Sequence, residues 1–83
     1  MLRLCDIAPG QQAFVCGLTT SGSMRRRLLE LGLVKGTAVE CLGRSPWGDP
    51  SAYLIRGAVI ALRKVDCAGI WVQSQDQEAQ PWD

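Results

Sequence analysis

The stretch that decides the fold is residues 21–37, SGSMRRRLLELGLVKGT. Met24, Leu28 and Leu31 recur at the i, i+4 and i+7 spacing of one face of an α-helix. Polar and charged residues fill the positions between them. The spacing therefore predicts an amphipathic helix over about residues 23–31, with one narrow apolar stripe to bury.

Both ends of this helix carry sequence signals. Ser21 and Ser23 can each accept a hydrogen bond from a free N–H group at the helix start. Gly32 follows the last apolar residue of the stripe, where a left-handed residue commonly ends a helix. Leu33 is placed to fold back on the last turn, and Gly36 allows a second sharp turn. We expect extended structure to begin directly afterwards.

Three consecutive arginines lie in the first half of this helix. At about 100° per residue, Arg26 points away from Leu28 and should be solvated, while Arg27 lies on a flank. The stem of Arg25 has to cross apolar surface to bring its charge to water. Glu30 lies one turn after Arg26 and can pair with it. The run indicates either an ordinary solvated face or a docking face for an acidic partner or a phosphate.

Length, charge and composition limit the classes of protein. Eighty-three residues with 47% hydrophobic side chains make one domain with a small core. The net charge of +1 gives no global basic field for nucleic acid. No apolar run approaches the ~20 residues that span a bilayer, and no secretory signal follows Met1, so a cytoplasmic location is expected.

Residue types also limit the chemistry. The chain has no histidine, which excludes Ser-His-Asp and Cys-His catalytic sites within it. The carboxylates are scattered singly, so no catalytic residue is assigned. Cys5, Cys16, Cys41 and Cys67 show no C-x-x-C pairing, so we expect small apolar side chains and no metal ligands. Convergence of two or more of them on a soft metal stays open.

The rest of the chain reads as short strands separated by turn residues. Alternation or apolar runs predict strands over residues 11–18, 37–42, 51–55, 58–62 and 70–72. Short strands in so small a core favour a mainly β fold, a closed or nearly closed barrel of about five strands that hides its edges. The helix is then inserted after the first strand and covers one opening or face.

The connections complete this picture. Residues 44–50, with two prolines and a glycine, predict a loop, and residues 64–68 predict one helical turn. We expect one domain over residues 1–73. Residues 74–83 form a polar tail predicted to be disordered, in which Trp82 is the only large apolar side chain.

In this order and spacing the chain resembles the FeoA family of ferrous iron transport accessory proteins. The residues that carry the resemblance are Leu4, Asp6, Pro9, Gly10, Arg26, Arg27, Leu28, Leu29, Glu30, Leu31, Gly32, Leu33, Gly36, Thr37, Pro46, Gly48, Asp49, Pro50, Gly57, Ile60, Ala61, Leu62, Arg63, Ala68, Ile70 and Val72. The resemblance implies an SH3-like barrel with an inserted helical segment, similar to the C-terminal domain of diphtheria-toxin-repressor-type regulators.

The resemblance also implies a regulatory partner of FeoB, the membrane permease for Fe(II), through its cytoplasmic GTP-binding domain. No catalytic motif, cofactor or agreed set of metal ligands comes with it. Candidate partner contacts are Arg25, Arg26 and Trp47, because arginine and tryptophan often anchor interfaces. For Trp47 the alternative is a lid over the barrel end. Trp71 should be half-exposed, since its strand neighbours point the opposite way.

Two other functions stay open. The first is direct binding of a transition metal by cysteines, as a sensor or chaperone, although Fe(II) prefers nitrogen and oxygen ligands. The second is nucleic-acid binding, which small barrels often perform and which the near-neutral charge disfavours. Homo-oligomerisation through a strand edge or the tail also remains open.

Overall fold

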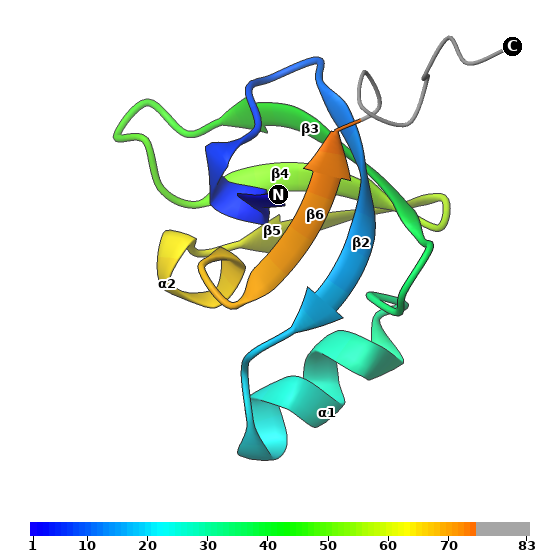
Figure 1. Ribbon diagram of the computed structural model, residues 1–83. Helices are drawn as coiled ribbons and strands as arrows, with labels where there is room; N and C mark the ends of the chain where they lie inside the picture. The colour runs from blue at the N-terminus through cyan, green and yellow to red at the C-terminus, as the bar shows by residue number, and fades with distance from the viewer. Residues whose placement is uncertain (75–83) are drawn as a thin grey trace, which may run out of the picture.

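A computed structural model describes residues 1–74, and these form a single curved β-sheet with one long helix at its end (Figure 1). The elements, in chain order, are β1 (Leu2–Arg3), the 3-10 turn η1 (Leu4–Asp6), β2 (Gln12–Leu18), α1 (Gly22–Glu30), β3 (Ala38–Arg44), β4 (Ser51–Ile55), β5 (Ala58–Leu62), α2 (Lys64–Cys67) and β6 (Ile70–Ser74). The mainly β class with a helix after the first long strand is confirmed.

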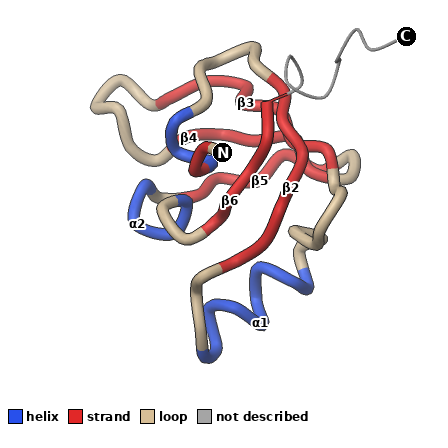
Figure 2. Tube along the Cα trace, in the orientation of Figure 1, coloured by secondary structure: helices blue, strands red, loops and turns tan. Residues whose placement is uncertain are grey.

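The sheet has six antiparallel strands in the order β1-β6-β2-β3-β4-β5. Two bulges interrupt its ladders, one in β2 at Cys16 and one in β3 at Leu42. Each bulge adds a residue to one strand and increases local bend and twist. The sheet therefore curls around one core, as an SH3-like barrel requires (Figure 2).

The inward faces of the strands match the predicted alternation. Ala13 and Val15 of β2 are buried, whereas the alternate residues Phe14 and Cys16 are only half-buried. The complete buried cluster is Leu4, Ile7, Ala13, Val15, Leu28, Leu33, Val39, Cys41, Tyr53, Ile55, Leu62, Cys67, Ile70 and Val72. It draws on η1, both helices and five of the strands, so it ties every part of the domain to one core.

Helix α1 docks on this core through its predicted stripe. Leu28 is fully buried, and Met24 and Leu31 pack against the core from its edge. The helix ends in a Schellman motif, because Leu33 N–H donates to Leu28 O and Gly32 N–H donates to Leu29 O, both at 3.0 Å. Gly32 has a φ of 104°, as the predicted left-handed end requires.

Four expectations need correction. The strand β1 was missed, because two residues are too few to show any alternation. The Ser21 side chain makes no capping hydrogen bond, although the residue occupies the N-cap of α1. Arg44, expected to begin a loop, is the last residue of β3. Ser74, expected to begin the tail, is the last residue of β6. The remainder of the predicted tail, with Trp82, lies outside the described residues.

Candidate functional site

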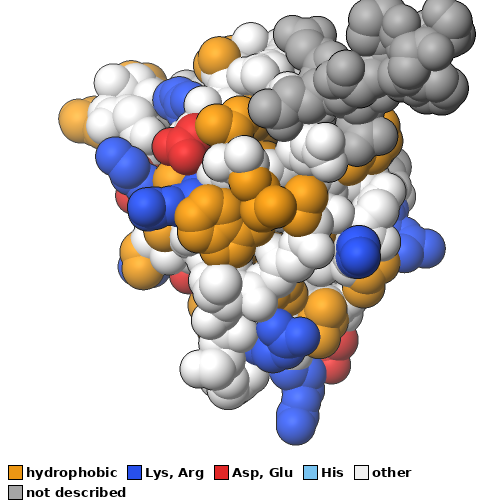
Figure 3. Space-filling view, viewed as in Figure 1, with side chains coloured by type: hydrophobic (Ala, Val, Ile, Leu, Met, Phe, Trp, Pro, Cys, Tyr) orange, Lys and Arg blue, Asp and Glu red, His pale blue; other side chains and the backbone are white. Residues whose placement is uncertain are grey.

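The outer face of α1 carries three consecutive arginines. Burial of Leu28 turns the opposite side of the helix to solvent, and Arg25, Arg26 and Arg27 are all exposed. Figure 3 shows lysine and arginine side chains at this end of the molecule, and further ones at the upper left and the right of the view. A shallow groove of about 450 Å³ runs along the face, lined by Gly22, Arg25, Arg26, Leu29 and Glu30. We call this surface the basic face of α1.

The three arginines differ in what holds them. Arg25 Nη1 donates a hydrogen bond of 3.3 Å to Leu18 O, which links the helix to the end of β2. Within residues 1–74 neither Arg26 nor Arg27 forms a hydrogen bond or ion pair, so the Arg26–Glu30 pair that the spacing allows is not formed. Arg26 is therefore available to a partner, and Arg25 is partly committed to the fold.

The position of these cations along the helix is electrostatically unfavourable. The first turn of α1 carries no acidic residue, and Arg25 and Arg26 follow it directly. The N-terminal half of a helix presents the positive end of its dipole, and charges near a terminus interact with it by about 0.3–1 kcal/mol. A negatively charged partner would offset both this interaction and the mutual repulsion of the arginines.

Trp47 lies elsewhere in the molecule. It sits in the loop between β3 and β4, which is at the opposite end of the sheet from α1 (Figure 2). The loop is closed by a 3.0 Å bond from Ser45 N–H to Pro50 O, and Asp49 Oδ1 accepts from Lys64 N–H at 2.8 Å. Trp47 is 88% exposed, so the alternative that it covers the barrel end is wrong. The structure does not bring it together with Arg25 and Arg26.

Sequence reasoning missed the role of Arg56. This residue and Gly57 form the two-residue connection between β4 and β5, and both have positive φ, as a type I′ turn demands. The Arg56 stem lies over Gly32 at the end of α1. The pair Arg56-Gly57, between two segments predicted as strands, indicated the turn itself. Nothing in the local sequence indicated which element the side chain would reach.

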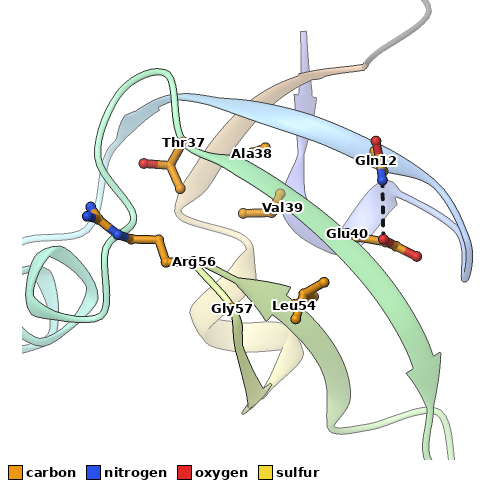
Figure 4. A pocket seen from close by; sticks show the side chains of 8 residues that line it. All are labelled: Gln12, Thr37, Ala38, Val39, Glu40, Leu54, Arg56 and Gly57. Atoms are coloured by element: carbon orange, nitrogen blue, oxygen red, sulfur yellow. Dashed lines mark hydrogen bonds between the residues drawn. The ribbon is translucent and has the colours of Figure 1, made fainter.

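A second groove, of about 320 Å³, lies beside that turn (Figure 4). Gln12 Nε2 donates a hydrogen bond of 3.2 Å to Glu40 Oε1, so these two polar side chains of the groove are paired with each other. Arg56 extends away from the other lining side chains, toward α1. Thr37 is the one other polar side chain of the lining, and the rest is formed by Ala38, Val39, Leu54 and Gly57. The groove therefore offers few polar groups to a ligand.

The cysteines do not assemble a metal site within the described chain. Cys5 and Cys16 are half-buried, and Cys41 and Cys67 are buried. Among residues 1–74 no three cysteine or carboxylate side chains come together in a way that would hold an ion. Burial raises the pKa of Cys67 to about 11, although a hydrogen bond from Tyr53 partly opposes this. The buried thiol is thus neutral and behaves as core.

Together these features define the class of the chain, a small SH3-like β-barrel domain with an exposed basic helix. The FeoA from Stenotrophomonas maltophilia, described as a procaryotic SH3 domain protein and crystallised with zinc, is 26% identical. It matches 88% of this chain and 91% of its own length with a TM-score of 0.79. A manganese-dependent transcriptional repressor, 21% identical, matches 88% of this chain and 36% of its own with a TM-score of 0.78, which shows likeness of fold alone.

The chain belongs to the FeoA family, because the FeoA domain model matches residues 2–74. The solution structure of FeoA from Chlorobium tepidum is 32% identical and covers 88% of this chain and 70% of its own, with a TM-score of 0.83. The recognition made from the ordered motifs is confirmed.

One relative adds a functional association. A Porphyromonas gingivalis protein named as a fusion of Fe(2+) transport protein A with the Fe(2+) transporter FeoB is 33% identical over 72 residues. The match covers 87% of this chain but 8% of the fusion protein. The family is therefore part of a ferrous iron transport system. Within residues 1–74 no helix is both long and apolar enough to cross a membrane.

Proposed function

We propose that this protein is a cytoplasmic regulatory module of Fe(II) uptake that binds the cytoplasmic GTP-binding part of a FeoB-type permease. The observation that carries the proposal is the fusion in one relative of a domain like this one to the transporter itself. Fusion keeps two domains at a high effective concentration, which favours their contact. A domain that binds the transporter as a separate chain would gain from such a fusion. The membrane is reached only through the permease.

The basic face of α1 supports a mode of binding. Its arginines are exposed, Arg26 has no partner among residues 1–74, and no carboxylate other than Glu30 lines the groove. A domain of this size offers about 600–800 Å² to a partner, the range of transient regulatory contacts. We assign Arg25 and Arg26 to an acidic surface of the permease. Trp47 is a separate contact at the far end of the barrel.

The test is a binding titration of the purified cytoplasmic domain of a FeoB-type permease with wild type, Arg26→Glu, Trp47→Ala and Lys35→Glu. Lys35 is an exposed lysine beyond the other end of α1, so its variant carries the same charge change away from the groove. We expect Arg26→Glu to weaken binding by about tenfold or more. Trp47→Ala should weaken it independently.

The controls separate the face from bulk charge. Wild-type affinity should fall as salt rises, because exposed charges are screened. If Lys35→Glu weakens binding as much as Arg26→Glu, the basic face is not the contact. Absence of binding by the wild type at low salt would remove the permease as partner. A change in GTP hydrolysis on mixing would show the direction of regulation.

A nucleic-acid role is tested in the same assay. An oligonucleotide replaces the permease domain at low salt, where phosphate contacts are strongest. The three arginines lie on one helix, but the chain carries a net charge of only +1. We expect no binding in this arm.

A further inference from the structure

The strand β5 ends the sheet with an open edge. It pairs only with β4, and no described residue pairs with its other side. Its sequence is AVIAL, without a charge, a proline or a bulge. Natural edge strands usually carry one of these devices, because an unprotected edge invites another strand. An edge left in this state is a candidate for strand addition.

The register identifies the backbone groups that the edge presents. The two-residue turn makes Ile55 and Ala58 a hydrogen-bonded pair, and the ladder then alternates without a shift. Val59 and Ala61 therefore occupy the non-hydrogen-bonded positions, and their N–H and C=O groups point away from β4. Neither residue makes another backbone hydrogen bond within residues 1–74. Two donors and two acceptors thus stand in a row along β5.

Apolar side chains surround this row. Val59 of β5 is 67% exposed, and Val65 of α2 is 70% exposed. A groove of about 440 Å³ separates β5 and α2 from α1, and Met24 and Leu28 contribute to its apolar wall. An added strand would find both unpaired backbone groups and an apolar surface for alternate side chains. This is the combination that strand-addition sites use for affinity and selectivity.

The charges around the groove select the occupant. Arg56 precedes β5, Arg63 and Lys64 follow it, and Arg27 lies across the groove, whereas Asp66 is the one acid in the lining. Antiparallel pairing of β5 with a second copy, centred on Ile60, would bring the turn at Arg56 of one copy near the end of β5 in the other, where Arg63 and Lys64 lie. Like charges placed opposite each other are destabilising. Self-association is therefore disfavoured at this edge.

We propose that β5 receives an extended segment of a partner protein as a seventh strand, and that this segment has a short apolar centre with acidic residues at both ends. The acidic ends lie against Arg56 and against Arg63 and Lys64, and the apolar centre enters the groove. Arg27 borders this groove, but Arg25 and Arg26 of the basic face of α1 line a different one. The inference stands whether or not that face binds the permease.

The test uses a short capped peptide of alternating valine and threonine with two acidic residues at each end. Its counterpart with lysines at both ends is the charge control. Backbone amide NMR of the full chain should show the largest shifts and slowed exchange at Val59 and Ala61, with the acidic peptide only. Shifts confined to α1, or no saturable shift, would overturn the proposal.

Variants separate strand addition from general adhesion. Ala61→Pro removes an outward N–H that β4 does not use, so the ladder to β4 stays intact. Binding should weaken about tenfold, while Ala61→Thr, which keeps the N–H, binds like wild type. Equal binding by both variants would contradict the backbone role. The double variant Arg63→Glu, Lys64→Glu reverses the charge at one end of the groove only, so it should abolish the preference for the acidic peptide over the lysine-ended one.

The oligomeric state of the protein tests whether a second copy of the chain occupies the β5 edge. Sedimentation of the full chain should give a monomer whose mass does not change with Ala61→Pro. A dimer that Ala61→Pro dissociates would show that a second copy occupies the edge, which would overturn the choice of occupant.

Discussion

The side chain of Arg56 lies so closely over Gly32 that a Cβ at position 32 would overlap with the Arg56 Cδ. The Arg56 Cγ would be 3.1 Å from the same Cβ. Arg56 belongs to the turn between β4 and β5, and Gly32 ends α1. This contact thus joins the helix to the far hairpin of the sheet, and it requires a residue without a side chain.

Gly32→Ala should therefore be more destabilising than a change of backbone preference alone. Gly32 has a φ of 104°, which costs an L-residue about 1–2 kcal/mol, and the new methyl group also displaces the exposed stem of Arg56. Urea unfolding measures the sum. We expect a larger loss than for Gly10→Ala, because Gly10 has a φ of 89° and open space around it.

A double variant isolates the contact. Truncation in Arg56→Ala frees the space over position 32, so Gly32→Ala should then cost about as much as Gly10→Ala. If the cost of Gly32→Ala is unchanged in that background, the Arg56 stem is not what the methyl group meets.

The docking of α1 depends on Leu28. This side chain is fully buried, whereas the adjacent Leu29 is 37% exposed in the groove of the basic face. Leu28→Ala should lower the free energy of unfolding by about 2–5 kcal/mol, because the cavity cannot fully collapse. Leu29→Ala is the matched control and should cost under about 1 kcal/mol. Similar losses for the two leucines would show that the helix is seated differently.

The exposure of Trp47 predicts that its side chain contributes little to stability. Trp47→Ala should change the free energy of unfolding by less than about 0.5 kcal/mol, since an 88% exposed ring has little packing to lose. Trp71→Ala is the comparison: its ring is half-buried, and the Arg3 guanidinium lies 5.5 Å from the ring centre. We expect a clearly larger loss there. A large loss for Trp47→Ala would mean that the loop packs more closely than described.

Local signals in the sequence predicted the buried face and the C-terminal end of α1, although not the absence of a Ser21 side-chain cap. The stripe of Met24, Leu28 and Leu31 and the Gly32 end predicted both its buried face and its Schellman end, because all of these interactions span fewer than two helical turns. The alternation of β2 and β6 was equally local, and the half-exposure of Trp71 followed from it. Elements of this kind are predictable because period and capping act within one segment.

Interactions between distant segments were not predictable. The strand β1 exists only because Leu2 and Arg3 pair with Val72 and Trp71 at the other end of the chain. The Arg25 bond to Leu18 and the Arg56 contact with Gly32 depend on how the helix sits on the sheet. The sequence suggested Trp47 by residue type, and only the fold shows that it lies far from the arginines.

The buried pair of Tyr53 and Cys67 predicts a loss of stability in alkali. Burial raises the pKa of Cys67 from about 9 to about 11, and burial together with the bond to Cys67 also raises the pKa of Tyr53. The folded state therefore holds these protons more tightly than the unfolded chain does. Their contribution to stability is complete below about pH 9 and is lost as pH rises through 11.

Unfolding titrations in urea across this range check the prediction. The free energy of unfolding should be level up to about pH 9 and then fall, and the fall should be shallower in both Cys67→Ala and Tyr53→Phe. Each variant lowers stability at neutral pH through lost packing or a lost hydrogen bond, so the slope above pH 9 is the measurement that matters. A wild-type profile that stays level to pH 11 would show that neither group is held in its neutral form by the fold.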